Sequence, residues 1–225
     1  MRSASESAFA PKADPLAYTQ SALHDPARDW PQTNCYVDLW IEAIHARGLP
    51  PEAMLGFTAT LDFEGDQFTF FKPPLEDIET LYGFVVHELS LYDDIADHIS
   101  EQCERGRLAM IETDAFHLPD TRGVSYRLEH SKTTIGVNRI DPVARSVDYF
   151  HNEGYFRAEG ADFDGLMAFG SQEGRQKLPP YAEIVKASFA PLDDKAMREC
   201  ARALLARHLS RRPAQNPIDA FASRL

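Results

Sequence analysis

The sequence predicts an α+β fold, with helices in its first part and antiparallel strands after them. The first observation is that apolar residues recur at helical spacing over residues 34–46. The second is a set of strand-like runs at 107–116, 133–141 and 146–152, separated by turn residues. A helical part followed by strands that return through short turns favours α+β over a parallel α/β sheet.

The helix over residues 34–46 has clear boundaries in the sequence "WPQTNCYVDLWIEAIHARGLPP". Thr33 and Asn34 are both good N-cap residues, and Gly48 and Pro50 are typical of a helix end. Cys35 therefore lies in the first turn, where unpaired backbone N–H groups and the helix dipole favour an anion. A thiol at this place has a stabilised thiolate.

The other elements follow from local patterns. Alternation on both sides of Glu64-Gly65-Asp66 predicts a hairpin with arms at 57–63 and 67–71. Asp141-Pro142 opens the turn between the strands 133–141 and 146–152. The remaining expected elements are a short helix or loop over 74–84, a helix within 90–106, a turn at 118–123, and helical segments at 183–188 and from Asp193 onward.

Composition and charge exclude several classes of function. The 225 residues include 44% hydrophobic and 26% charged residues, which is typical of a soluble globular protein. The net charge of −12 disfavours nucleic acid as a partner, and no run reaches the roughly 18 apolar residues that span a membrane. The expected organisation is a disordered leader over 1–15 and a single domain over 16–225, which ends in a basic helix at about 193–212. The basic helix is either a solvated face or a dock for an acidic partner.

Three cysteines at positions 35, 103 and 200 form neither a disulfide framework nor a zinc pattern. Reduced thiols and the lack of an apolar leader make the cytoplasm the expected compartment. Eight histidines are present, but no HxH, HExxH or CxxC spacing occurs, so we expect no metal site. Phosphate-binding loops and the GxSxG serine elbow are absent as well.

The order of three residue types in the chain fits nucleophilic catalysis. Cys35 opens a helix, His130 precedes the next long strand, and Asn152 ends the strand after that. A nucleophilic thiol needs a base, and the base needs a group that orients it. His151 and Asp148 are alternatives for the orienting role. The competing interpretation is that Cys35 is a small buried residue and that His130 only caps a strand.

Two further positions stand where a pocket could form. Asp114 ends the strand "LAMIET" and is either a turn carboxylate or a pocket residue. His117, before Leu118-Pro119, is either structural or lines a pocket. Backbone N–H groups near Cys35 would form the oxyanion site, with Gln32 or Asn34 as the side-chain donor.

The stretch "RLAMIETDAFHLPDTRGVSYRLEHSKTTIGVNRID" resembles the butirosin biosynthesis protein H N-terminal family. The matching features are a strand that ends in Asp114, the aromatic Phe116, Leu118-Pro119, and His130 before a strand. Cys35 matches the upstream helical cysteine. The sequence resembles a group of bacterial proteins even more closely through the segments "LPDT", "HSKTTI" and "YFHN". That group accompanies amino acid:carrier-protein ligases.

This resemblance implies a papain-like cysteine fold and acyl transfer. The donor would be an acyl or aminoacyl thioester on the phosphopantetheine arm of an acidic carrier protein, and the acceptor would be an amine. Cys35, His130 and Asn152 would be catalytic, and Asp114, His117 and Lys132 would line the pocket; no bound cofactor is implied. The basic residues expected to dock the carrier are Arg198, Arg202, Arg207, Arg211 and Arg212. Alternatives are a cysteine peptidase or amidase with the same triad, and a non-catalytic carrier-binding module.

Overall fold

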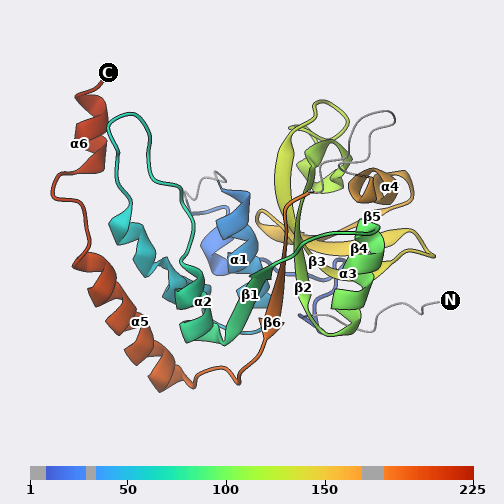
Figure 1. Cartoon of the computed structure of the whole chain (residues 1–225), viewed down its shortest axis with the longest axis horizontal. Helices are drawn as coiled ribbons and strands as arrows, with labels where there is room; N and C mark the ends of the chain where they lie inside the picture. Colours follow the sequence, from blue (N-terminus) through green and yellow to red (C-terminus); the bar gives the residue numbers. More distant parts are fainter. Residues whose placement is uncertain (1–8, 29–33, 169–179) are drawn as a thin grey trace. The chain divides into compact units, whose positions relative to one another are not determined.

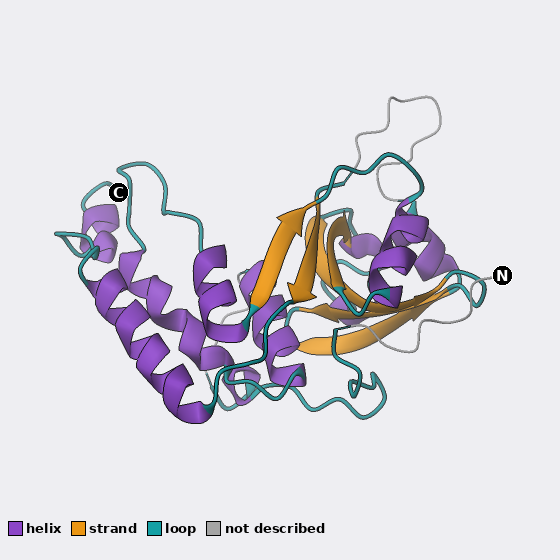
Figure 2. Cartoon of the chain, turned by 60° about the horizontal axis from the view of Figure 1, so that its bottom comes forward, coloured by secondary structure: helices purple, strands orange, loops and turns teal. Residues whose placement is uncertain are grey.

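The computed structural model describes residues 9–28, 34–168 and 180–225, and the chain divides into two compact units (Figure 1). Unit 1 comprises residues 1–49 and 86–187, and unit 2 comprises residues 50–85 and 188–225. The single domain that the sequence predicted over 16–225 is thus built from two units. Figure 2 shows that the strands gather in unit 1, while unit 2 is almost entirely helices and loops.

A six-stranded sheet with the strand order β1-β6-β2-β3-β4-β5 forms the centre of unit 1. Its strands are β1 (Phe84–Glu88), β2 (Leu108–Asp114), β3 (Lys132–Asp141), β4 (Ser146–His151), β5 (Gly154–Glu159) and β6 (Ala182–Ala187). The pairs from β6 through β5 are antiparallel. The division between the two units falls within β1, after Val85. The helices of unit 1 are α1 (Cys35–Ala46), α3 (Ile95–Glu104) and α4 (Ala161–Met167), with the short 3-10 turns η1 (Ala22–His24), η3 (Ala115–His117) and η4 (Pro119–Thr121).

Helices cover both faces of this sheet (Figure 1). α1 packs on β3 and β4, and Leu39 lies so close to Gly136 that a methyl group there would be 3.2 Å from the leucine side chain. On the other face, Ile95 and Ile99 of α3 pack against Ile111. Because side chains alternate between the faces of a strand, the register assigns strand residues to the α1 face or to the α3/α4 face, except at the irregularity of β3 between Val137 and Arg139.

Unit 2 is held together by packing between helices. Its elements are η2 (Pro51–Thr60), α2 (Leu75–Tyr82), α5 (Asp194–Leu209) and α6 (Pro217–Ala222). Gly56 of η2 lies against the backbone of Leu205, at the distance where a methyl group would just touch it (3.4 Å). The buried Asp77 carboxylate of α2 accepts a hydrogen bond from His208 Nε2 at 2.5 Å and also pairs with Arg207.

Several expected elements are confirmed. α1 begins at Cys35 with Asn34 as its N-cap, and α5 begins after the N-cap Asp193. β3 and β4 cover the expected strands around the Asp141 turn. The helix within 90–106 starts later than the pattern suggested, because the side chain of Asp94 caps it.

Three expectations are wrong. The segment 183–188 is strand β6 and not a helix, because its apolar run is buried between two neighbouring strands. The hairpin over 57–71 is reduced to one bridge, Phe63 to Phe68, since residues 51–60 form η2 against α5. The leader expected to be disordered over 1–15 is ordered from Phe9, which is fully buried; residues 1–8 lie outside the described part.

No helix within residues 9–28, 34–168 and 180–225 is long and apolar enough to cross a bilayer.

Candidate functional site

Cys35 is the first residue of α1 and is partly exposed. The Asn34 side-chain oxygen accepts hydrogen bonds from the backbone N–H groups of Tyr36 (3.1 Å) and Val37 (3.2 Å), which fixes the helix start at the cysteine. The thiol is free and lies where the helix dipole favours a negative charge. The side-chain oxygen of Asn34 thus caps α1. Gln32, the other residue expected to donate to the oxyanion, lies outside the described residues.

His130 forms a close pair with a carboxylate. Its Nδ1 lies 2.5 Å from Oδ2 of Asp114, and its ring stacks on Phe116 at 4.4 Å between centroids. The side chain of His130 is 71% exposed and that of Asp114 is 16% exposed. A carboxylate at Nδ1 fixes the tautomer and leaves Nε2 to accept a proton from a reacting group. This is the arrangement expected of an oriented general base.

The strand register places Tyr36, next to Cys35, and the Asp114 carboxylate on the same side of the sheet, while His130 stacks on Phe116 beside Arg127, which pairs with Asp162 of α4. Tyr36, next to the cysteine, donates a hydrogen bond to the Glu183 carboxylate at 2.9 Å, and Glu183 faces Met110 across β2 and β6. Asp114 follows Met110 by four residues along β2, so both point to the α1 face, about 13 Å apart at the rise of a strand. In the described part of the chain, no hydrogen bond joins the Cys35 thiol to a histidine.

The residues expected to orient His130 lie elsewhere. Asn152 occupies the turn between β4 and β5, with a left-handed φ of +45°, and Asp148 is engaged by Arg157 at 2.6 and 3.0 Å. Neither these two nor His151 hydrogen bonds to His130 within the described residues. Asp114, which the sequence placed in the pocket, is the carboxylate that holds the imidazole.

His151 belongs to a buried cluster on the α3/α4 face of the sheet. Its Nδ1 lies 2.5 Å from Oδ2 of Asp120, and its Nε2 lies 2.8 Å from the hydroxyl of Thr133. Tyr149 donates to the other oxygen of Asp120 at 2.6 Å, and burial raises the pKa of this tyrosine. The alternation along β4 puts His151 opposite to the face that α1 covers, because Phe150 faces Gly136.

The other expected pocket residues lie at the same end of the sheet as His130. Lys132 is exposed and forms an ion pair with Glu112 at 2.7 Å. His117 packs so closely on α4 that no side chain fits at Gly165. Burial, and then the positive charge of Arg127, lower the pKa of His117. Both residues are therefore satisfied by neighbours in this structure.

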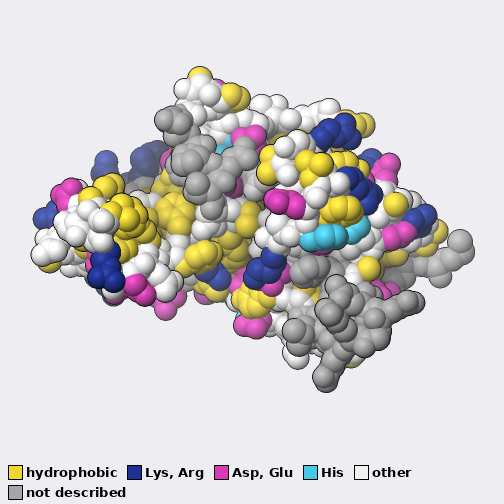
Figure 3. Space-filling model, turned by 90° about the horizontal axis from the view of Figure 1, so that it is seen from above, with side chains coloured by type: hydrophobic (Ala, Val, Ile, Leu, Met, Phe, Trp, Pro, Cys, Tyr) yellow, Lys and Arg dark blue, Asp and Glu magenta, His cyan; other side chains and the backbone are white. Residues whose placement is uncertain are grey.

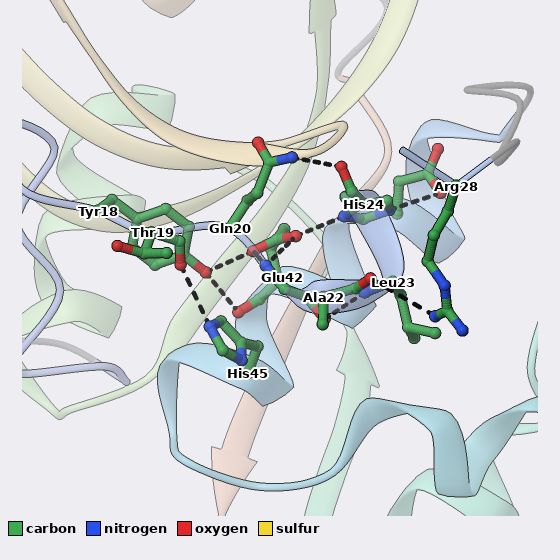
Figure 4. A network of polar contacts seen from close by, with 11 residues as sticks. Tyr18, Thr19, Gln20, Ala22, Leu23, His24, Arg28, Glu42 and His45 are labelled. Atoms are coloured by element: carbon green, nitrogen blue, oxygen red, sulfur yellow. Dashed lines mark hydrogen bonds and ion pairs between the residues drawn. The ribbon is translucent and has the colours of Figure 1, made fainter. Parts of the chain in front are cut away.

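A second polar network, which the sequence did not predict, surrounds α1 (Figure 4). The fully buried Glu42 pairs with His24 Nδ1 and accepts hydrogen bonds from the hydroxyl of Tyr18 (2.6 Å) and the backbone of Ser21 (3.1 Å). His24 Nε2 lies 3.3 Å from Asp38. The network ties the segment before α1 to the helix that carries the cysteine.

The charge of His24 follows from this network. Burial lowers the pKa of the imidazole, but hydrogen bonds to Asp38 and Glu42 and their charges outweigh this effect and raise the pKa to about 9. The available signal was two carboxylates one turn apart, at positions 38 and 42, in an otherwise apolar helix. Cys35 shares their stripe, since positions 35, 38 and 42 are three and four residues apart.

Figure 3 shows a face of the molecule on which histidine, hydrophobic and basic side chains lie close together. Within the residues that the structure describes, no group of three or more His, Cys, Asp or Glu side chains could hold a metal ion. The chemistry that these side chains can perform is nucleophilic attack by a thiol and proton transfer by an oriented imidazole.

Residues 19–187 match the family described as the DUF1839 N-terminal domain. The chain belongs to this family. The DUF1839 match contains α1, the whole described part of the sheet and the His130–Asp114 and His151–Asp120 pairs, and it ends at the last residue of β6. α5 and α6 lie beyond it. A search of curated proteins gave no match.

Proposed function

We propose that this DUF1839 protein transfers an acyl or aminoacyl group from a carrier-protein thioester to an amine, through an acyl-enzyme on Cys35. The observation that carries the proposal is the His130–Asp114 pair, 2.5 Å apart, with its carboxylate at the end of β2. A helix with a leading cysteine, packed on an antiparallel sheet whose loop presents an oriented histidine, agrees with a papain-like arrangement. Asp114 takes the orienting role in this proposal.

The environment of the three thiols supports Cys35 as the nucleophile. Cys103 is fully buried, and burial raises its pKa to about 12. Burial, and then the charge of Asp77, raise the pKa of Cys200. Cys35 is partly exposed and lies in the first turn of α1.

The reaction has two balanced steps. The Cys35 thiolate attacks the thioester carbonyl, the oxyanion is held by the backbone N–H of Cys35, and the pantetheine sulfur leaves with a proton from His130. The product is a second thioester, so this exchange is nearly isoenergetic. His130 then takes a proton from the incoming amine, whose nitrogen attacks the acyl carbon, and the Cys35 sulfur leaves as thiolate. Exclusion of water separates this transferase from a peptidase, amidase or thioesterase.

The proposal requires the thiol and imidazole to approach each other when substrate binds, because no hydrogen bond joins them here. Catalytic hydrogen bonds are often long in unliganded sites. The same observation favours the second candidate, a carrier-binding module without catalysis.

Intact-protein mass spectrometry with a glycyl pantetheine thioester tests the proposal. Wild type should gain the glycyl mass at Cys35, Cys35→Ala should gain none, and His130→Ala should react more slowly. Cys200→Ala is the matched control, since it removes another partly exposed thiol and should react like wild type. A wild-type protein that stays unacylated while its fold is intact would exclude the transferase. Added amine should then release the acyl group as an amide, whereas release as free acid would indicate a hydrolase.

A further inference from the structure

The exposed side of α5 in unit 2 carries a mixed basic and apolar stripe. The helix buries Met197, Leu204 and His208 on its inner side. Positions 198, 202, 205 and 209 follow at spacings of four, three and four residues, so they form one exposed row on the other side. We define the α5 stripe by the exposed side chains of Arg198, Arg202, Leu205 and Leu209, together with the exposed Arg212, which lies three residues beyond the end of the helix.

The arginines of the stripe are available to a partner. Arg198, Arg202 and Arg212 form no ion pair with any residue that the structure describes. Arg207, which the sequence grouped with them, is different: its guanidinium pairs with the buried Asp77. The docking set expected from the sequence therefore loses Arg207.

Two leucines lie among these free charges. Leu205 is 42% exposed and Leu209 is 46% exposed. A surface of cationic head groups around aliphatic side chains is complementary to an acidic amphipathic helix. It is less suited to a phosphate backbone, which offers no apolar side chain to the two leucines.

We infer that the α5 stripe is a docking surface for an acidic helix of the carrier protein that donates the acyl group. The inference rests on the proposed function for the identity of the partner. Arg198 and Arg202 would face carboxylates one turn apart, and Leu205 and Leu209 would cover an apolar side chain between them. The contact would be electrostatically steered and would weaken with salt.

Calorimetric titration with an isolated acidic acyl carrier protein in its apo form tests the surface without any chemistry. We expect saturable binding at low ionic strength and at least about tenfold weaker binding for Arg198→Glu with Arg202→Glu, since like charges would then face each other. Leu209→Gln should weaken binding by several-fold. Arg224→Glu is the control for net charge, because Arg224 is exposed in the same unit and lies off the stripe. Circular dichroism confirms that each variant keeps its helices.

Each outcome either supports or overturns the inference. No saturable binding up to millimolar carrier, or equal losses for Arg202→Glu and Arg224→Glu, overturns the inference. Tighter binding of single-stranded RNA or of anionic vesicles than of carrier also overturns it. Cys35→Ala should bind like wild type. If the small pantetheine thioester acylates the protein but the stripe variants bind the carrier like wild type, the docking surface is refuted and the proposed function stands. If carrier binding depends on the stripe but no acylation occurs, the docking surface stands and the proposed function is refuted.

Discussion

Two histidine–carboxylate pairs at one end of the sheet have the same geometry and different surroundings. Nδ1 lies 2.5 Å from a carboxylate oxygen both in His130–Asp114 and in His151–Asp120. The His130 side chain is 71% exposed, whereas the His151 side chain is 2% exposed. Distance alone therefore does not separate a reactive histidine from a structural one.

The partners at the second nitrogen make the difference. His151 Nε2 is taken by Thr133, and Tyr149 occupies the remaining oxygen of Asp120, so every polar atom of the buried pair is satisfied. His130 Nε2 has no hydrogen-bond partner in the described part of the chain. The buried pair is thus fully occupied by its neighbours, whereas Nε2 of the exposed pair is open to a reactant.

The largest expected effect is on the free energy of unfolding at the buried pair. His151→Leu leaves Oδ2 of the buried Asp120 carboxylate without a hydrogen-bond donor, which should cost about 3–5 kcal/mol. His130→Leu is the matched control and should cost less than about 1 kcal/mol, because exposed pairs contribute little. Urea denaturation followed by Trp40 fluorescence measures both, since Trp40 is fully buried in unit 1. Equal losses in the two variants would remove the distinction between the pairs.

His24 sharpens the comparison, because it is buried and charged. Its pKa is raised to about 9 in the folded protein, above the ordinary value of 6.5, so its stabilising contribution is complete below pH 6.5 and is lost as the pH rises toward 9. The contribution is on the order of 3 kcal/mol. The difference in unfolding free energy between wild type and His24→Gln should be largest at pH 6 and should shrink by pH 9.5. A difference that stays constant over this range would mean that His24 is neutral in the fold.

The smallest expected effect is kinetic and concerns the exposed pair. Asp114→Asn keeps the acceptor for the Phe116 N–H but removes the charge that orients His130. Acylation of Cys35 by the pantetheine thioester should slow by about 10- to 100-fold, which corresponds to about 1.4–2.7 kcal/mol. Asp120→Asn, on the other face, should lower the free energy of unfolding and leave the acylation rate of the folded protein close to that of wild type. Mass spectrometry of samples quenched at successive times gives the acylation rates. An unchanged rate for Asp114→Asn would show that the exposed pair does not assist acylation.

Local chemistry allowed much of the fold to be predicted from the sequence. Asn34, Cys35 and Gly48 define α1 by capping and by helix-ending rules that need no tertiary information. β6 was missed because "EIVKAS" is too short to distinguish strand from helix, and only its burial between two strands decides. The division into two units was also missed, since each unit takes its residues from two separate stretches of the chain.

The candidate site was predictable in its residue types but not in its pairings. Cys35 and His130 were found from chain order, and their roles stay predictions. The partner of His130 was expected one strand later, near Asn152, whereas Asp114 lies sixteen residues before it. Which carboxylate meets an imidazole depends on strand register and on the path of a loop, and neither is encoded in residue spacing.

The loop between β2 and β3 is anchored on both faces of the sheet, and this has an evolutionary consequence. Asp114 at its start holds His130, and Asp120 six positions later holds His151 on the opposite face. The length between these two anchors cannot vary without breaking one of them. The exposed bend at Gly123, with a φ of +89°, lies outside this constraint. We expect insertions and deletions among DUF1839 relatives to accumulate at that bend, while the six-residue interval stays fixed.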